Sequence, residues 1–366
     1  MSFLPTAEQS SLRAAARDLF AAHATPEARR AYVNRDADYD AKLWTLMAEL
    51  GLHGIVISER HGGADGTLLD LAMVLEEAGS ALLCSPFFAT AVLATTAITA
   101  TGDEEAMAKI LPSFARGECV ASLAFRTPPH GGTPAVAATR VASGYRLNGR
   151  AVHVVDGCAA EKFVVLARSD DGSGLFVTEG RQGLQTSDSA ALDPTRRLAD
   201  IEFTDSPATL IGSPTDGPAN LDHALSIAQV AMAVEQVGAA QRCLDMAIEY
   251  TTSRSQFSRP IASFQAVKHA CADMFVDVQS ARSVALHAAW AFDADPIAFE
   301  SASHLAAALV SDAFYRTAAQ NIQLHGAIGF TWEHDAHLYL KRAISSARLL
   351  STPEQHREAT AKRLGL

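Results

Sequence analysis

The chain has 366 residues, of which 48% are hydrophobic and 19% charged, and this balance excludes an intrinsically disordered protein. The formal net charge is −11 without a run of basic residues, which argues against nucleic-acid binding but leaves room for a small polyanionic ligand. The N-terminus has no basic segment followed by an apolar one, and no apolar run reaches about 18 residues without a charge. We therefore expect a cytoplasmic protein with neither a signal peptide nor a membrane span.

From residue 6 to about 117 the apolar residues recur with a helical period. Thr6 and Gln9 have the spacing of a capping box, which predicts a helix start. The helical stretches end at glycine, proline or turn residues, and glycines cluster in HGGADG, residues 61–66, which we expect to be a loop. Residues 1–117 are therefore predicted to form an N-terminal helical domain.

Between residues 118 and 212 the sequence changes to alternating polarity with many β-branched residues. Asn148-Gly149 and Asp171-Gly172 are dipeptides typical of hairpin turns. This segment is predicted to be a small, antiparallel, barrel-like β domain.

Helical periodicity returns near residue 219, where the first helix is expected to span some 35 residues. Four long helices with wide apolar faces predict a bundle over residues 213–366. The expected fold is therefore mostly α-helical with a β domain in the middle.

The five cysteines show no CxxC or metal-ligand spacing, so no metal site is expected. Cys243 and Cys271 lie in apolar helical contexts, which is typical of core thiols. The other three are Cys84, Cys119 and Cys158.

The stretch RSQFSRPIASFQAVKH, residues 254–269, joins the two longest helices. Arg254 and Arg259 flank Phe257, and Pro260 is expected to open the next helix. Two cations beside a helix N-terminus can hold a pyrophosphate, although solvated arginines in a helix turn would have the same pattern.

A second unusual stretch is QLHGAIGFTWEHD, residues 323–335. We expect a helix to end at His325-Gly326, with Gly329 shortly after it. Glycines allow a ligand close to the backbone, and Gln323 can donate and accept hydrogen bonds there. A glycine C-cap with no ligand is the alternative interpretation.

Taken together, RxxFxxPIxxFQxxKH and QxHGxxGFTWEHxxxLYLKR, within a helical, β and helical order, resemble the acyl-CoA dehydrogenase family over essentially the whole chain. The resemblance implies a tetramer-forming fold with bound FAD and α,β-dehydrogenation of an acyl-CoA thioester. In that reaction a carboxylate removes an α-proton while the β-hydride moves to the flavin. An electron-transfer flavoprotein or similar acceptor is implied as a further partner.

By motif position, the resemblance assigns cofactor contacts to both stretches. Arg254 and Phe257 would approach the FAD of a neighbouring subunit, and Gln265 would lie near the same cofactor. Gln323 and the turn at Gly326 and Ala327 would cradle the pyrophosphate. Ala327 replaces the more usual glycine, and its methyl group narrows the approach to the backbone.

The β domain departs from the family pattern. LAFRTPPHGGTP, residues 123–134, stands where an acidic, Gly-Ser-rich flavin-contacting segment is usual. In GRAVHVV, residues 149–155, His153 takes a tryptophan position and Val155 a threonine position. We expect this subunit to hold its own flavin ring poorly or not at all. His153 is either a flavin contact or, as we favour, a half-buried strand histidine.

The catalytic carboxylate is also missing from its usual places. The position after the last bundle helix falls at Ser351, and the alternative position on the long helix falls at Ala228. Neither side chain acts as a base near neutral pH. Glu235 lies about 10 Å along the helix from Ala228, too far for proton transfer. Glu354 is a weak candidate, better interpreted as a solvated residue in the first turn of a helix.

The sequence lacks both usual bases and has a degraded flavin pocket. In this combination it resembles one subunit of the two-component acyl-CoA dehydrogenases of bacterial steroid side-chain catabolism. In such heterotetramers one chain supplies the base and the other completes the FAD site. Two alternatives stay open. The chain could be a self-sufficient flavoenzyme whose base is Glu354 or a β-domain histidine, or a non-catalytic scaffold that kept the fold.

Overall fold

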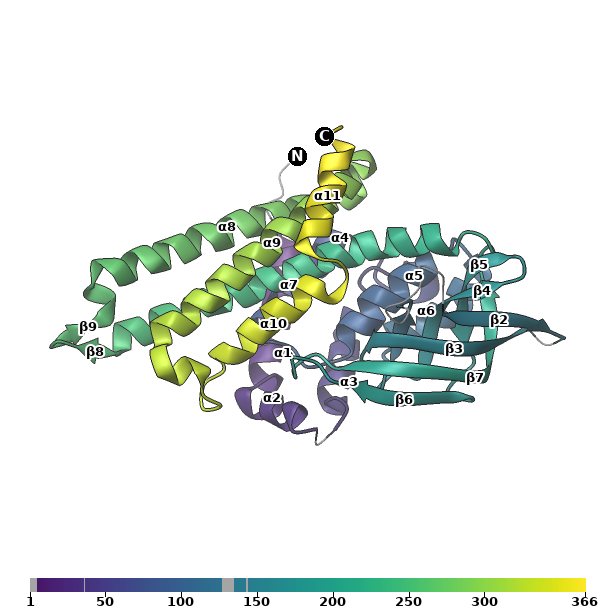
Figure 1. Ribbon diagram of the computed structural model, residues 1–366, viewed down its shortest axis with the longest axis horizontal. Helices are drawn as coiled ribbons and strands as arrows, with labels where there is room; N and C mark the ends of the chain where they lie inside the picture. The colour runs from purple at the N-terminus through teal and green to yellow at the C-terminus, as the bar shows by residue number, and fades with distance from the viewer. Residues whose placement is uncertain (1–4, 36, 127–134, 143) are drawn as a thin grey trace. The chain divides into compact units, whose positions relative to one another are not determined.

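A computed structural model describes residues 5–35, 37–126, 135–142 and 144–366 (Figure 1). The chain forms two compact units, one from residues within 1–33, 68–83 and 229–366, the other from residues within 34–67 and 84–228. Within the described residues, no helix has both the length and the apolarity needed to cross a membrane. The three domain boundaries predicted from the sequence remain a prediction.

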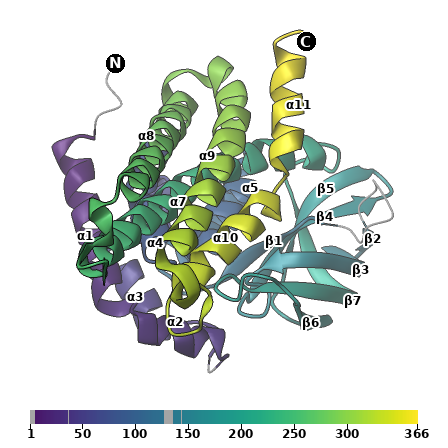
Figure 2. The ribbon, with the colours of Figure 1, turned by 60° about the vertical axis from the view of Figure 1, so that its left-hand side comes forward.

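The first unit is built of helices that pack side by side (Figures 1 and 2). The long helix α7 enters it at residue 229, and two motif-bearing turns connect the helices that follow. Its elements are α1 (Ala7–His23), α2 (Pro26–Val33), α4 (Leu68–Ser80), α7 (Gly217–Ser253), β8 (Ser255–Gln256), β9 (Arg259–Pro260), η4 (Ile261–Ser263), α8 (Gln265–Ala294), α9 (Pro296–His325), η5 (Gly326–Phe330), α10 (Ala336–Leu349) and α11 (Pro353–Arg363).

The second unit combines short helices with a seven-stranded sheet. Its helical elements are α3 (Ala41–Glu49), η1 (Leu52–Gly54), η2 (Glu59–His61), η3 (Phe88–Ala94), α5 (Thr95–Thr99) and α6 (Glu104–Ala115). Its strands are β1 (Ala121–Ala124), β2 (Val136–Val141), β3 (Gly144–Val155), β4 (Lys162–Ser169), β5 (Gly172–Thr178), β6 (Leu184–Ser189) and β7 (Leu198–Ile211).

The sheet closes on itself, because the pairings run from β4 through β2, β3, β7 and β5 back to β4. Among the described residues, β1 pairs with β4 alone and β6 with β7 alone, so these two strands keep a free edge beside the closed ring. The sheet buries apolar residues such as Phe163, Phe176 and Ile201. The expected barrel-like β domain in a mostly helical chain is therefore confirmed. The expectation of purely antiparallel strands is wrong in detail, since β1 and β2 each pair with β4 in parallel.

The two predicted hairpin dipeptides have different outcomes. Asp171-Gly172 does mark a hairpin, in which Ser169 pairs with Gly172 across β4 and β5. Asn148-Gly149 is not a turn, because β3 continues through it and the register against β7 shifts there. The Asn148 side chain accepts a hydrogen bond from the Asp205 backbone N–H on β7, and Gly149 adopts a φ of 132°. The dipeptide therefore forms a β-bulge.

Helices α4 and α7 cross in direct backbone contact. A Cβ added to Gly79 would lie 1.8 Å from the carbonyl oxygen of Glu235, and one added to Gly238 would lie 1.7 Å from that of Glu76. Only glycine fits both positions, so this pair of residues sets the spacing of the two helices.

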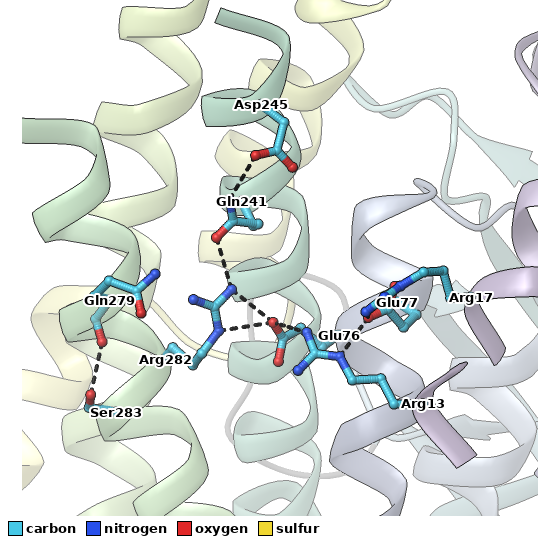
Figure 3. Close-up of polar contacts among 9 residues, drawn as sticks. All are labelled: Arg13, Arg17, Glu76, Glu77, Gln241, Asp245, Gln279, Arg282 and Ser283. Carbon is cyan, nitrogen blue, oxygen red and sulfur yellow. Dashed lines mark hydrogen bonds and ion pairs between the residues drawn. The ribbon is translucent and has the colours of Figure 1, made fainter. Parts of the chain in front are cut away.

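A buried ionic network fixes α1, α4, α7 and α8 to one another (Figure 3). The Glu76 carboxylate, 2% exposed, lies 2.6 Å from Arg13 Nη2 and 2.9 Å from Arg282 Nη2. Arg282 also donates to the Gln241 side chain. Burial opposes ionisation of Glu77, but hydrogen bonds from Arg17 and Arg13 outweigh it and lower the pKa of that carboxyl. Each arginine thereby balances a carboxylate that would be costly to bury alone.

Candidate functional site

The first motif forms a hairpin between α7 and α8. Phe257 and Ser258 occupy its tip with φ values of 53° and 62°, which suit a tight two-residue turn. Pro260 lies in β9, and α8 begins only at Gln265, so the expectation that Pro260 opens the helix is wrong. The extended backbone at Pro260, with ψ 138°, and the turn η4 separate the two elements.

The two arginines of this hairpin differ in their surroundings. Arg259 stacks on the Phe264 ring with its guanidinium carbon 4.1 Å from the ring centroid. Arg254 is exposed, and among the described residues its side chain has no ion-pair or hydrogen-bond partner. Phe257 is 88% exposed. Arg254 and Phe257 are therefore both exposed on this hairpin. Gln265 is exposed at the start of α8 and hydrogen-bonds the ring of His269.

The second motif ends α9. His325 is the last helical residue, and Gly326 follows with a φ of 65°, which favours glycine. No heavy atom lies within 4 Å of a Cβ added at Gly326, so the space beside this backbone is open. Gln323 and Ala327 are both exposed on the same turn. The predicted helix end at His325-Gly326 is confirmed.

Both motifs lie at the same end of the helical unit, because α8 runs antiparallel to α7 and α9 returns beside it (Figure 1). The rings of Tyr250, four residues before Arg254, and His325 stack with centroids 4.4 Å apart. The helical unit therefore brings together a free guanidinium, an exposed aromatic ring and an open glycine turn that are distant in sequence.

The two usual base positions hold no carboxylate. Ala228 is fully buried on α7. Ser351 lies between α10 and α11, and its hydroxyl donates to the Gln355 side chain at 2.9 Å. Glu235 is buried and paired with Arg342 at 2.6 Å.

Glu354 occupies the first turn of α11, which starts with Pro353 and a capping box formed by Thr352 and Gln355. Its side chain is 75% exposed and lies 3.3 Å from Arg357. Its own backbone N–H and the Thr352 hydroxyl lower the pKa of the Glu354 carboxyl. A base that removes an α-proton works best with a pKa near the operating pH, and this environment shifts Glu354 the other way.

In the β unit, His153 is exposed and has a φ of 53°, so the interpretation as a half-buried strand histidine is wrong. The register of β3 against β7 shifts between Ala151 and Val154, and the His153 backbone N–H donates to the Asp200 carboxylate. The bulge turns this side chain to the outside of the sheet, which leaves it available for a ligand contact. Of the stretch 123–134, residues 127–134 lie outside the described residues.

A mostly helical protein with a closed β barrel, and with paired motifs suited to a dinucleotide cofactor, defines the class of flavin-dependent acyl-thioester dehydrogenases. Residues 6–118 match the N-terminal domain and residues 215–365 the C-terminal domain of acyl-CoA dehydrogenases. The acyl-CoA dehydrogenase IpdE2 of Mycobacterium tuberculosis is 38% identical over 96% of this chain and 95% of its own length. The chain belongs to the acyl-CoA dehydrogenase family.

Two solved structures of similar fold add detail. A variant of the Tcur3481-Tcur3483 steroid ACAD superposes with a TM-score of 0.87 and 27% identity, covering 98% of both chains. The ChsE4-ChsE5 complex from Mycobacterium tuberculosis superposes with a TM-score of 0.90 and 26% identity, covering 100% of this chain and 99% of that one. The chain is accordingly an oxidoreductase with an acyl-CoA substrate and FAD as its cofactor.

The residues present fit part of an FAD site. The free guanidinium of Arg254 and the open turn at Gly326 suit phosphate oxygens, and the exposed Phe257 ring suits contact with an aromatic cofactor. FAD supplies the hydride acceptor when bound. Sequence reasoning missed Tyr250 and His334 beside this site, although four aromatic or histidine side chains within residues 325–334 were a visible signal.

Proposed function

We propose that this chain is one subunit of a hetero-oligomeric acyl-CoA dehydrogenase in which a second family member supplies the catalytic carboxylate. The observation that carries the proposal is the chemistry at the two base positions. Ala228 cannot accept a proton, and the Ser351 hydroxyl is engaged with Gln355. The nearby carboxylates are also accounted for, since Glu235 pairs with Arg342 and Glu354 faces solvent.

The exposed hairpin supports the same proposal from the cofactor side. Arg254 and Phe257 are exposed, and the Phe257 ring has only an edge contact with Phe264 among the ring contacts of the described residues. A residue that binds FAD across an interface must be exposed in the isolated chain. The role of this chain is then to bind and orient the FAD of the partner subunit. Arg254, Phe257 and the turn at Gly326 would make the contacts.

The substrate proposed is the CoA thioester of a bulky, steroid-derived acyl group. Support comes from the similarity to a steroid ACAD and to the two-chain ChsE4-ChsE5 complex, both over nearly the whole chain. An electron-transfer flavoprotein or a similar acceptor would then reoxidise the flavin.

The decisive experiment purifies this chain alone and together with the acyl-CoA dehydrogenase encoded beside it. We expect a hetero-oligomer that carries flavin absorbance and oxidises a steroid-side-chain CoA thioester faster than butyryl-CoA. We expect the chain alone to be colourless and inactive. A yellow, active homo-oligomer of this chain would overturn the proposal in favour of a self-sufficient enzyme. The absence of flavin from every assembly would favour a scaffold.

A further inference from the structure

A chain of aromatic contacts connects the two cofactor motifs. The imidazole of His325 lies against the ring of Tyr250, with centroids 4.4 Å apart and planes 27° from parallel. The ring of His334 contacts the same imidazole with centroids 4.3 Å apart. Tyr250 is on the last turns of α7, His325 ends α9, and His334 precedes α10. The imidazole of His325 therefore touches α7, which ends directly before Arg254, and His325 itself directly precedes Gly326.

Hydrogen bonds define how each histidine is held. His325 Nδ1 lies 2.8 Å from the backbone carbonyl oxygen of Asn321. A carbonyl oxygen only accepts, so Nδ1 carries the proton and the ring is locked against its own helix. His334 Nδ1 accepts a hydrogen bond from the Ala336 backbone N–H at the first turn of α10. This bond requires an unprotonated Nδ1, so His334 packs in its neutral form.

We infer that His325 is a positioning residue, which couples the Arg254 hairpin to the Gly326 turn so that both meet FAD in one fixed geometry. Gly326 directly follows His325, its left-handed backbone has open space around it, and its N–H bonds to the carbonyl oxygens of Gln323 and Ile322 in its own helix. Tyr250 is one helical turn from Arg254. Without the ring at position 325, the two motifs would move independently, and FAD would have to order both when it binds.

The inference rests on the proposed cofactor role of Arg254 and Gly326, but part of its test does not need FAD. In the FAD-free assembly, we expect His325→Ala to increase amide hydrogen exchange in both loops, residues 254–260 and 326–330. His325→Phe keeps an aromatic ring in the stack and should restore protection. His287→Ala is the matched control, because His287 also lies beside an aromatic ring, that of Trp290, at 5.8 Å.

The second readout is the affinity of the same assembly for FAD, measured by fluorescence titration. We expect about a tenfold weaker affinity for His325→Ala, from the loss of two ring contacts, and near wild-type affinity for His325→Phe and His287→Ala.

The pH dependence gives a third readout. The charged groups acting on His334 are Arg242 on α7 and Asp335 directly before α10, and His337 on α10 interacts with the same imidazole. Burial lowers the pKa of His325 and of His334, so both stay neutral at pH 7. FAD affinity should fall in the wild type as the pH is lowered below the ordinary pKa of histidine, about 6.5, and fall less in His325→Phe.

The inference is overturned if His325→Ala leaves hydrogen exchange in both loops unchanged, or if His325→Phe is as defective as His325→Ala. Hydrogen exchange in both loops could increase in His325→Ala although no assembly binds FAD. In that case His325 couples the two loops, but the proposed cofactor role of Arg254 and Gly326 is wrong. The two conclusions are therefore separable.

Discussion

Glu235 on α7 and Arg342 on α10 form a buried ion pair. Their Oε1 and Nη1 atoms are 2.6 Å apart, and the side chains are 7% and 2% exposed. Glu235 lies on the same helix as Ala228, the vacant base position, and is the nearest acidic residue that follows it in the sequence. Its carboxylate is engaged by a guanidinium, so its role is to link two helices.

Glu235→Ala should destabilise the protein by roughly 3–5 kcal/mol, because the guanidinium of Arg342 stays buried without the Glu235 carboxylate. Chemical denaturation of the assembly measures this loss. The double variant Glu235→Leu with Arg342→Met should lose less than the single variant, since it removes both buried charges. If the double variant loses as much unfolding free energy as the two single substitutions together, this account is contradicted.

Gly238→Ala should cost roughly 3 kcal/mol or more in unfolding free energy, or prevent folding, because its methyl group would overlap the Glu76 carbonyl. Ala272→Ser adds one heavy atom at an exposed position of α8 and serves as the control. Thermal unfolding compares the two. If the Gly238→Ala and Ala272→Ser variants unfold at the same temperature, α4 and α7 can move apart without a loss of stability.

Glu354→Gln should leave turnover of the assembly within about twofold of the wild type, because the exposed carboxylate contributes neither a base nor a buried contact. Steady-state kinetics with the acyl-CoA substrate test this. A loss of about a thousandfold, with FAD retained, would instead identify Glu354 as a relocated base.

Arg254→Ala should weaken FAD binding by roughly tenfold to a hundredfold, the usual effect of losing a hydrogen bond to a charged group. The fold should be unaffected, because the side chain is exposed and unpaired among the described residues. Arg140→Ala, another exposed arginine, is the control. Fluorescence titration of FAD into the assembly distinguishes the two. If the Arg254→Ala and Arg140→Ala variants bind FAD with equal affinity, Arg254 is not part of the cofactor site.

The assembly should lose stability as the pH falls from about 6.5 toward 4. His356 Nδ1 lies 3.0 Å from His304 Nδ1, which ties α11 to α9. Burial, and then the neighbouring His304, lower the pKa of His356 to about 4. The unfolded chain therefore binds a proton that the folded chain rejects, so the stability is present above pH 6.5 and lost below it.

Denaturation at several pH values measures this slope. His356→Phe should flatten it by up to one proton, whereas the exposed control His223→Phe should not. An unchanged slope in His356→Phe would show that the imidazole pair does not control acid stability.

Local sequence patterns were sufficient wherever neighbouring residues decide the structure. The capping box at Thr6, the long helix α7 and the helix end at Gly326 were predictable, because they depend on bonds within one or two helical turns. The stretch of η3 and α5, residues 88–99, was not anticipated. Its residues are almost all buried, so it has no polar face from which to read a period.

The sequence by itself determined the two motifs at residues 254–269 and 323–335 and the absence of a carboxylate at Ser351 and Ala228, because these depend only on residue identity and spacing. Only the tertiary structure decided that His153 sits on a bulge and that Asn148 is not a turn, since register against β7 is set by a distant strand. The contact between Tyr250 and His325 likewise joins residues 75 positions apart. Such pairings follow from how whole helices pack, which no local pattern encodes.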